Sequence, residues 1–265
     1  MSDFTEQDLS DSRFDRVLLR RASFRDVALE DATFTGVNLA GARIRSAWLD
    51  GVRLTGVEVP DLEIHGELRR LVVNGVDVVA FVEAELDRRM PERPLMRPTD
   101  TAGFREAFAV LDRLWGGTVE AARALPPALL HECVDGEWSF TETVRHLGFA
   151  HACWVGGVVL ADPDPWHPLD LPWDEAPAVE GVPWDRDVRP SLDEVLAVRA
   201  QRRAAVGAVL ADLTDDGLRR PVTSATAFMG DADSLTVADC LRVVLNEEWE
   251  HRLYAERDLA VLASR

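Results

Sequence analysis

An apolar residue recurs at every fifth position through the first 65 residues of the chain. Phenylalanine, leucine, isoleucine or valine occupies this central position thirteen times without a break, from Phe4 to Ile64. A small or β-branched residue stands two positions before most centres, as Ala22 does before Phe24. A period of five fits neither an α-helix nor a long β-strand. It predicts a chain that makes a short extended side, turns and makes the next side, with each centre and the residue two before it facing inward.

This repeat resembles the pentapeptide-repeat family, most clearly in ATFTGVNLAGARI (residues 32–44) and VRLTGVEV (residues 52–59). The resemblance implies a right-handed, four-sided β-helix in which each coil takes four repeats. The register slips by one residue after Ile64, and we expect the β-helix to occupy residues 1–80. Residues 81–98 are expected to form a capping helix and a proline-containing linker that shield the edge of the last coil. The flat faces of stacked coils would also suit a homodimer contact.

Residues 99–265 show helical spacing of apolar residues in four blocks. The blocks run from about residue 101 to 124, 139 to 160, 191 to 213 and 235 to 263. Serine and glutamate three residues apart are spaced as capping boxes at the starts of the second and third blocks. A long loop rich in proline and tryptophan separates these two blocks. The pattern predicts a four-helix bundle after the β-helix, so we expect a multidomain β + α protein.

Composition and charge narrow the classes of function. The formal net charge is −18, of which residues 1–90 contribute −5, and such an acidic surface repels nucleic acid. All 29 basic residues are arginine, which excludes a lysine Schiff base and a P-loop. No apolar run reaches the roughly 20 residues that span a bilayer. The three cysteines are widely spaced and the N-terminus has no secretory signal, so we expect a cytoplasmic protein that binds neither nucleic acid nor membrane.

Three residues on two of the predicted helices form a candidate metal site. Glu247 and His251 are four residues apart on the last helix and therefore share one face. His146 lies on the second helix, and a bundle can bring the three side chains into one interior. Two imidazoles and one carboxylate suit Zn²⁺, Ni²⁺ or Fe²⁺ and leave a coordination position open. The residues alone also fit a solvated Glu–His pair and a histidine of the core.

Two segments around these residues resemble the DinB superfamily. DGEWSFTETVRHLGFAHACW (residues 135–154) is similar to its second-helix signature, and LNEEWEHRLYAERDL (residues 245–259) is similar to its last-helix signature. Most members carry H-x-x-x-H in the last helix, whereas the glutamate here is similar to the variant in mycothiol-dependent maleylpyruvate isomerase. The resemblance covers roughly residues 100–265. It implies that His146, Glu247 and His251 bind one divalent metal, with Zn²⁺ ranked ahead of Ni²⁺ and Fe²⁺.

Five further residues are candidates for the substrate pocket. One of them, Glu248, is also the alternative to Glu247 as a metal ligand, because a residue three positions before His251 lies on the same side of the helix. Arg145 and Arg252 are each adjacent to a proposed ligand and would bind a substrate carboxylate or form surface ion pairs. A tryptophan of the second helix and a histidine of the long loop would line an apolar pocket or pack the loop onto the helices. In chain order the five are Arg145, Trp154, His167, Glu248 and Arg252.

The leading hypothesis for function combines the metal with a thiol. A metal with three protein ligands can hold water or a thiol in its open position, and coordination deprotonates the thiol. The DinB resemblance implies mycothiol or bacillithiol as the thiol. We therefore expect a metal-dependent thiol S-transferase or thiol-assisted isomerase, with a small electrophile as its second partner. Two alternatives stay open: a metal-dependent hydrolase or cyclase without a thiol, and a non-enzymatic binding protein whose repeats mimic DNA or mediate dimerisation.

Overall fold

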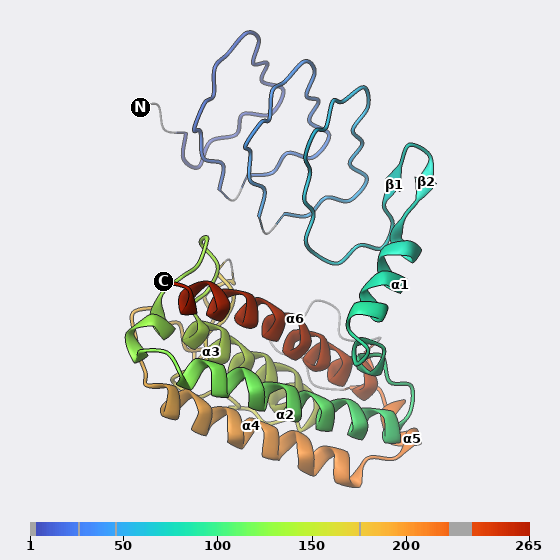
Figure 1. Cartoon of the computed structure of the whole chain (residues 1–265), viewed down its shortest axis with the longest axis vertical. Coiled ribbons are helices and arrows are strands. Elements are labelled where there is room, and N and C mark those ends of the chain that lie inside the picture. The colour runs from blue at the N-terminus through green and yellow to red at the C-terminus, as the bar shows by residue number, and fades with distance from the viewer. Residues whose placement is uncertain (1–3, 26, 46, 175, 223–234) are drawn as a thin grey trace. The chain divides into compact units, whose positions relative to one another are not determined.

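The computed structural model describes residues 4–25, 27–45, 47–174, 176–222 and 235–265. The chain divides into two compact units, Met1–His65 and Gly66–Arg265 (Figure 1). We call them the repeat unit and the helical unit. The division lies ahead of the boundary expected near residue 80.

Turns recur every five residues in the repeat unit. The residue two positions after each centre adopts a positive φ at nine described turns. At four of these turns, spaced ten residues apart, a backbone hydrogen bond closes the corner, as in the amide of Ser12 donating to the carbonyl of Leu9 at 3.1 Å. A positive φ at the third residue of such a turn is the feature of a type II turn. The nine residues are Glu6, Asp11, Arg16, Arg21, Asp31, Gly36, Gly41, Gly51 and Gly56.

The apolar centres of the repeat unit keep much of their surface accessible. Phe14 and Phe34 are each 61% exposed and Leu19 is 52% exposed. The described residues of this unit contain no β-strand. The centres, which were expected to face inward, are therefore not buried in this structure. Local turn chemistry sets the period of five, whereas burial also requires neighbouring coils to approach to the roughly 4.8 Å spacing of paired strands.

A hairpin and a helix begin the helical unit. Strand β1 (Val72–Val73) pairs antiparallel with β2 (Val76–Asp77), and the intervening Asn74 and Gly75 have φ values of 49° and 85°. Two positive φ values define a type I′ turn, for which Asn-Gly is a preferred dipeptide. The sequence interpretation continued the repeat to about residue 79, but this hairpin takes its place. Helix α1 (Val79–Arg89) and the 3₁₀ helix η1 (Arg93–Met96) follow.

Capping side chains mark where the long helices of this unit begin. The Ser139 side chain accepts a hydrogen bond from the Glu142 amide, and the Glu142 carboxylate accepts one from the Ser139 amide at 2.9 Å. The same reciprocal arrangement starts α4 at Ser191 and α6 at Thr236. The remaining elements are α2 (Thr101–Arg123), η2 (Pro127–His131), α3 (Phe140–His151), η3 (Ala152–Val159), α4 (Leu192–Asp212), α5 (Asp215–Leu218) and α6 (Val237–Ala263).

The second long helix changes form halfway along its length. Helix α3 ends at His151, and η3 continues it as a π-helix, in which the Leu160 amide donates to the Val155 carbonyl at 2.9 Å. The sequence pattern predicted one α-helix to about residue 160. The following loop lies so close to η3 that a Cβ atom on Gly156 would be 2.8 Å from the Cβ of Pro165. A glycine at this position therefore allows the loop to pack against the helix.

The apolar faces of α2, α3, α4 and α6 are buried against one another. Phe104 and Leu111 of α2 and Leu241 and Leu245 of α6 are all 0% exposed and belong to one apolar cluster. A second cluster around Trp115 includes residues of all four helices. Burial of these side chains supplies the main driving force for folding of the unit. No helix in the described part of the chain is long and apolar enough to cross a bilayer.

Candidate metal centre

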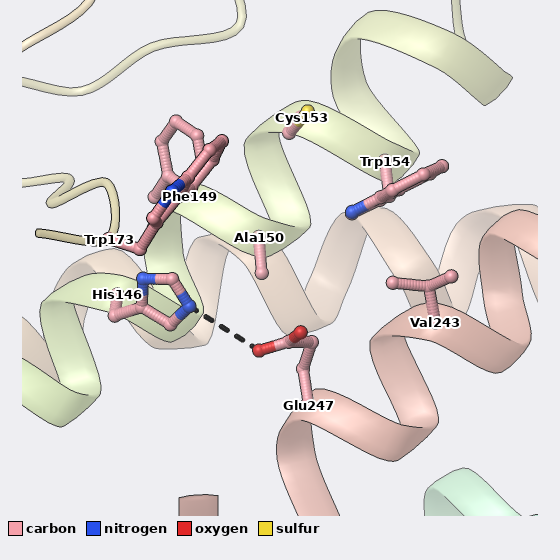
Figure 2. A pocket seen from close by; sticks show the side chains of 8 residues that line it. All are labelled: His146, Phe149, Ala150, Cys153, Trp154, Trp173, Val243 and Glu247. Carbon is pink, nitrogen blue, oxygen red and sulfur yellow. Dashed lines mark ion pairs between the residues drawn. The ribbon is translucent and has the colours of Figure 1, made fainter. Parts of the chain in front are cut away.

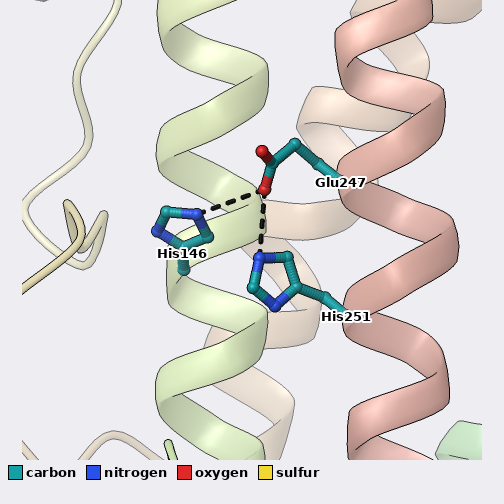
Figure 3. Close-up of side chains that lie close together, drawn as sticks. All are labelled: His146, Glu247 and His251. Atoms are coloured by element: carbon teal, nitrogen blue, oxygen red, sulfur yellow. Dashed lines mark ion pairs between the residues drawn. The ribbon is translucent and has the colours of Figure 1, made fainter. Parts of the chain in front are cut away.

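The candidate ligands lie on the facing sides of α3 and α6. His146 is in the second turn of α3, and Glu247 and His251 lie one turn apart in the middle of α6. Helix α3 packs against α6, and all three side chains point into the space between the two helices (Figure 3). The structure thus brings His146 together with a Glu–His pair that lies about 100 positions later in the sequence.

One carboxylate oxygen lies close to both imidazoles. Oε2 of Glu247 is 3.0 Å from Nε2 of His251 and 3.4 Å from Nε2 of His146. The potential ligand atoms of the three residues all lie within 4.8 Å of one another. Tetrahedral zinc with bonds of roughly 2.0–2.1 Å places its ligand atoms about 3.3 Å apart. The three residues could therefore hold a metal ion with small side-chain shifts.

The surroundings favour an ionised Glu247 and a neutral His146. Burial acts to raise the pKa of Glu247, but its contacts with His146 and His251 outweigh burial and hold that pKa well below its usual range. Burial lowers the pKa of His146, against the opposing influence of Glu247. A carboxylate and a neutral imidazole are the protonation states that bind a metal.

A backbone carbonyl fixes the orientation of His146. Its Nδ1 lies 3.0 Å from the carbonyl oxygen of Leu171, a residue of the loop after η3. A carbonyl oxygen can only accept a hydrogen bond, so this contact places a ring proton on Nδ1 and directs Nε2 toward Glu247. Second contacts of this kind commonly orient metal-binding histidines.

Trp138 covers the two imidazoles on one side. The centroid of its ring lies 4.5 Å from that of His146 and 5.6 Å from that of His251, and it is nearly parallel to the latter. The indole Nε1 donates to Asp174 of the long loop at 3.1 Å. Trp138 belongs to the second-helix motif of the sequence, but the sequence analysis did not select it because the motif alone does not show which ring faces the histidines.

Arg145 is neither a surface residue nor available to a substrate. It is 2% exposed, and its guanidinium donates to the backbone carbonyls of Leu169, at 2.8 Å, and of Asp185. These bonds hold the long loop, which also carries Leu171, against α3. Both expectations for Arg145, carboxylate binding and a surface ion pair, are therefore wrong, since its donors are used to position the loop.

Glu248 faces away from the candidate metal site. It is 0% exposed, and its carboxylate accepts two hydrogen bonds from Arg199, at 2.8 and 2.6 Å. The same carboxylate lies 2.7 Å from Nε2 of His151 on α3. Successive residues of an α-helix differ by roughly 100° in direction, which separates Glu248 from Glu247. Glu248 is thus a buried packing residue, and the structure does not place it among the candidate ligands or in the pocket.

Arg252 and His167 also lie outside the candidate site. Arg252 is 5% exposed, lies 4.9 Å over the ring of Trp249 and donates to Glu256 at 2.6 Å. Nδ1 of His167 accepts a hydrogen bond from the Leu169 amide at 3.1 Å and so stabilises a turn of the loop. Neither residue lines the cavity next to the ligands, so the pocket role expected for each is wrong, whereas the ion pair expected as the alternative for Arg252 is present.

A cavity of about 210 Å³ adjoins His146 and Glu247 (Figure 2). Trp154 is the one residue of the five pocket candidates that lines it. The sequence analysis missed Ala150 and Val243, although a signal was present. Ala150 is four residues after His146 and Val243 is four residues before Glu247, so each shares a helix face with a candidate ligand. The loop brings Trp173 to the same cavity.

Comparison with known proteins identifies both parts of the chain. Residues 110–255 match the DinB superfamily, and residues 2–36 and 18–56 match pentapeptide repeats, in eight copies. Such repeats imply a β-helical N-terminal unit. Searches of curated proteins and of solved structures found no match. The first match covers more than half of the chain and includes all three candidate ligands. The chain therefore belongs to the DinB superfamily and carries pentapeptide repeats at its N-terminus.

Proposed function

We propose that the helical unit binds one divalent metal, Zn²⁺ before Ni²⁺ or Fe²⁺, through His146, Glu247 and His251. The observation that carries this proposal is the convergence of three ligand-type side chains around a single carboxylate oxygen. Proteins of the DinB superfamily typically bind a metal, which supports the same assignment. The contact between His146 and the Leu171 carbonyl supports it further, because it directs Nε2 toward the centre.

The reaction we propose is thiol S-transfer or thiol-assisted isomerisation of a small electrophile. When bound, the metal supplies a Lewis-acid centre that favours the deprotonated form of a low-molecular-weight thiol such as mycothiol or bacillithiol. The chain contributes the fixed imidazoles, the ionised Glu247 and a cavity beside them for the electrophile. In the transfer reaction the thiol sulfur bonds to the electrophilic carbon, the leaving group departs with its bonding electrons, and the thiol proton passes to water.

Metal analysis of the purified protein tests the ligand assignment. We expect close to one equivalent of metal in the full chain and a large loss in the variant His251→Ala. His65→Ala serves as the matched control, because His65 is an exposed histidine of the repeat unit that pairs with Glu63 and is not a candidate ligand. Metal retained at the original level in His251→Ala would show that the assignment is wrong.

An activity assay tests the proposed reaction separately. The zinc-loaded protein is mixed with cysteine or mycothiol and 1-chloro-2,4-dinitrobenzene, and the coloured thioether is followed as chloride is released. We expect turnover that needs both the thiol and the metal. Hydrolysis of 4-nitrophenyl acetate by the same sample in the absence of thiol, without thioether formation, would instead support the hydrolase alternative and refute thiol transfer.

A further inference from the structure

The cavity beside the candidate ligands has walls that are mostly apolar and aromatic. Figure 2 shows Phe149 and Trp173 on one side and Trp154 and Val243 on the other, with Ala150 between them on α3. Cys153 is the sixth lining residue that is not a candidate ligand. An apolar, planar group would therefore meet complementary surfaces along these walls.

The size of the cavity suits a single aromatic ring. Its volume of about 210 Å³ exceeds the roughly 150 Å³ of an engineered cavity that binds benzene. Aromatic side chains favour ring-shaped ligands, because offset-stacked and edge-to-face contacts add to the burial of apolar area. The aromatic residues of this cavity thus offer planar faces to a planar ligand.

The aromatic walls are held in place by their own packing. Phe149 is 4% exposed and stacks on Trp166, with ring centroids 5.3 Å apart and an interplanar angle of 13°. It meets Trp173 edge to face, with centroids 6.1 Å apart. Trp154 projects from the π-helix η3, a type of segment that is frequent at functional sites. A cavity with fixed walls can bind a ring without a large ordering cost.

We propose that this cavity binds the aromatic or otherwise planar, uncharged group of the electrophile and places its reactive carbon at the candidate metal centre. Ala150 and Val243 determine how large that group can be, since their side chains line the cavity one helical turn from His146 and from Glu247. This inference rests on the proposed function. It adds a substrate class, an electrophile with an aromatic ring, that neither the ligand set nor the family match specifies.

Two hydroxamates with the same metal-binding group test the inference. Benzohydroxamate carries a phenyl ring and acetohydroxamate a methyl group, so the ratio of their dissociation constants reports the contribution of the cavity. Calorimetric titration of the zinc-loaded full chain is expected to give benzohydroxamate an affinity about tenfold higher or more, because the ring buries additional apolar area. Equal affinities would overturn the inference while leaving the metal site intact. Failure of the protein to bind zinc would overturn the proposed function and this inference with it.

A cavity-filling variant locates the effect. Val243→Phe places a larger side chain on the cavity wall and is expected to reduce the preference for benzohydroxamate to about one, with unchanged zinc content. Val261→Phe is the matched control, because it makes the same substitution at an exposed position of the same helix. Trp154→Leu removes one aromatic wall and should weaken the preference independently. A preference that persists in both cavity variants would show that the ring binds elsewhere.

Discussion

Glu247 and Glu248 are adjacent in the sequence, yet their carboxylates take part in different interactions. Oε2 of Glu247 lies 3.4 Å from the imidazole of His146, whereas Glu248 is fully buried and accepts two hydrogen bonds from Arg199. Each glutamate links α6 to α3, since Glu248 also contacts His151. Of these two neighbours, Glu247 is therefore a candidate metal ligand, whereas Glu248 stabilises the packing of the helices.

Neutralising these two glutamates should affect stability and metal binding differently. Glu248→Gln leaves the Arg199 guanidinium buried without its charge partner, and we expect a loss of unfolding free energy of about 3–5 kcal/mol. Glu247→Gln removes a carboxylate that is partly exposed, so it should cost less stability than Glu248→Gln, yet it should strongly weaken metal binding. Urea unfolding of metal-free protein and metal analysis measure the two effects. Equal destabilisation by both substitutions would contradict the division of roles.

Trp138 should report metal binding through its fluorescence. Its ring lies 4.5 and 5.6 Å from the rings of His146 and His251, so a Ni²⁺ ion held by these histidines would be close enough to quench its emission. We expect a saturable decrease in emission on titration with Ni²⁺, and loss of most of this decrease in Trp138→Phe. Trp184→Phe, at an exposed tryptophan of the loop, is the control and should keep it. Full quenching in Trp138→Phe would argue for a different metal position.

Gly148 should be far less tolerant of alanine than a second helical glycine. A Cβ atom at Gly148 would lie 2.6 Å from Oδ1 of Asp170, a buried residue that Arg202 holds by a 2.7 Å ion pair. We expect Gly148→Ala to destabilise the protein by about 1–3 kcal/mol, measured by urea unfolding. Gly116→Ala, where the added methyl meets nothing within 4 Å, should stabilise it by about 0.5–1 kcal/mol. Similar effects of both substitutions on stability would show that the loop around Asp170 moves away from α3 at little cost.

Cys133 should react with thiol reagents well before Cys240. Cys133 is exposed, whereas Cys240 is 0% exposed and burial raises the pKa of its thiol to about 11. Burial and the nearby Glu142 also raise the pKa of Cys133, so its thiolate fraction, and with it the rate, should keep increasing above pH 9. Reaction of native protein with a disulfide reagent is expected to show a fast phase that disappears in Cys133→Ser. A fast phase that survives this substitution would contradict the predicted order.

Much of the helical unit could be predicted from short-range patterns. The serine–glutamate spacing at Ser139 and at Ser191 predicted where α3 and α4 begin, because a capping box depends only on residues three apart. The sequence pattern did not predict the hairpin of residues 72–77. There Asn74-Gly75 is a local signal for a tight turn, whereas the sequence analysis continued the five-residue repeat through these residues.

The sequence by itself determined the five-residue turns, the long helices and the three residues of the candidate centre, because each depends on spacing along the chain or on a motif. Only the tertiary structure decided the surroundings of those residues. It showed that Arg145 binds loop carbonyls, that Glu248 pairs with Arg199, and that the Leu171 carbonyl orients His146. These contacts join segments 24–49 residues apart. Their partners are selected by the packing of helices and loop in three dimensions, which no spacing along the chain specifies.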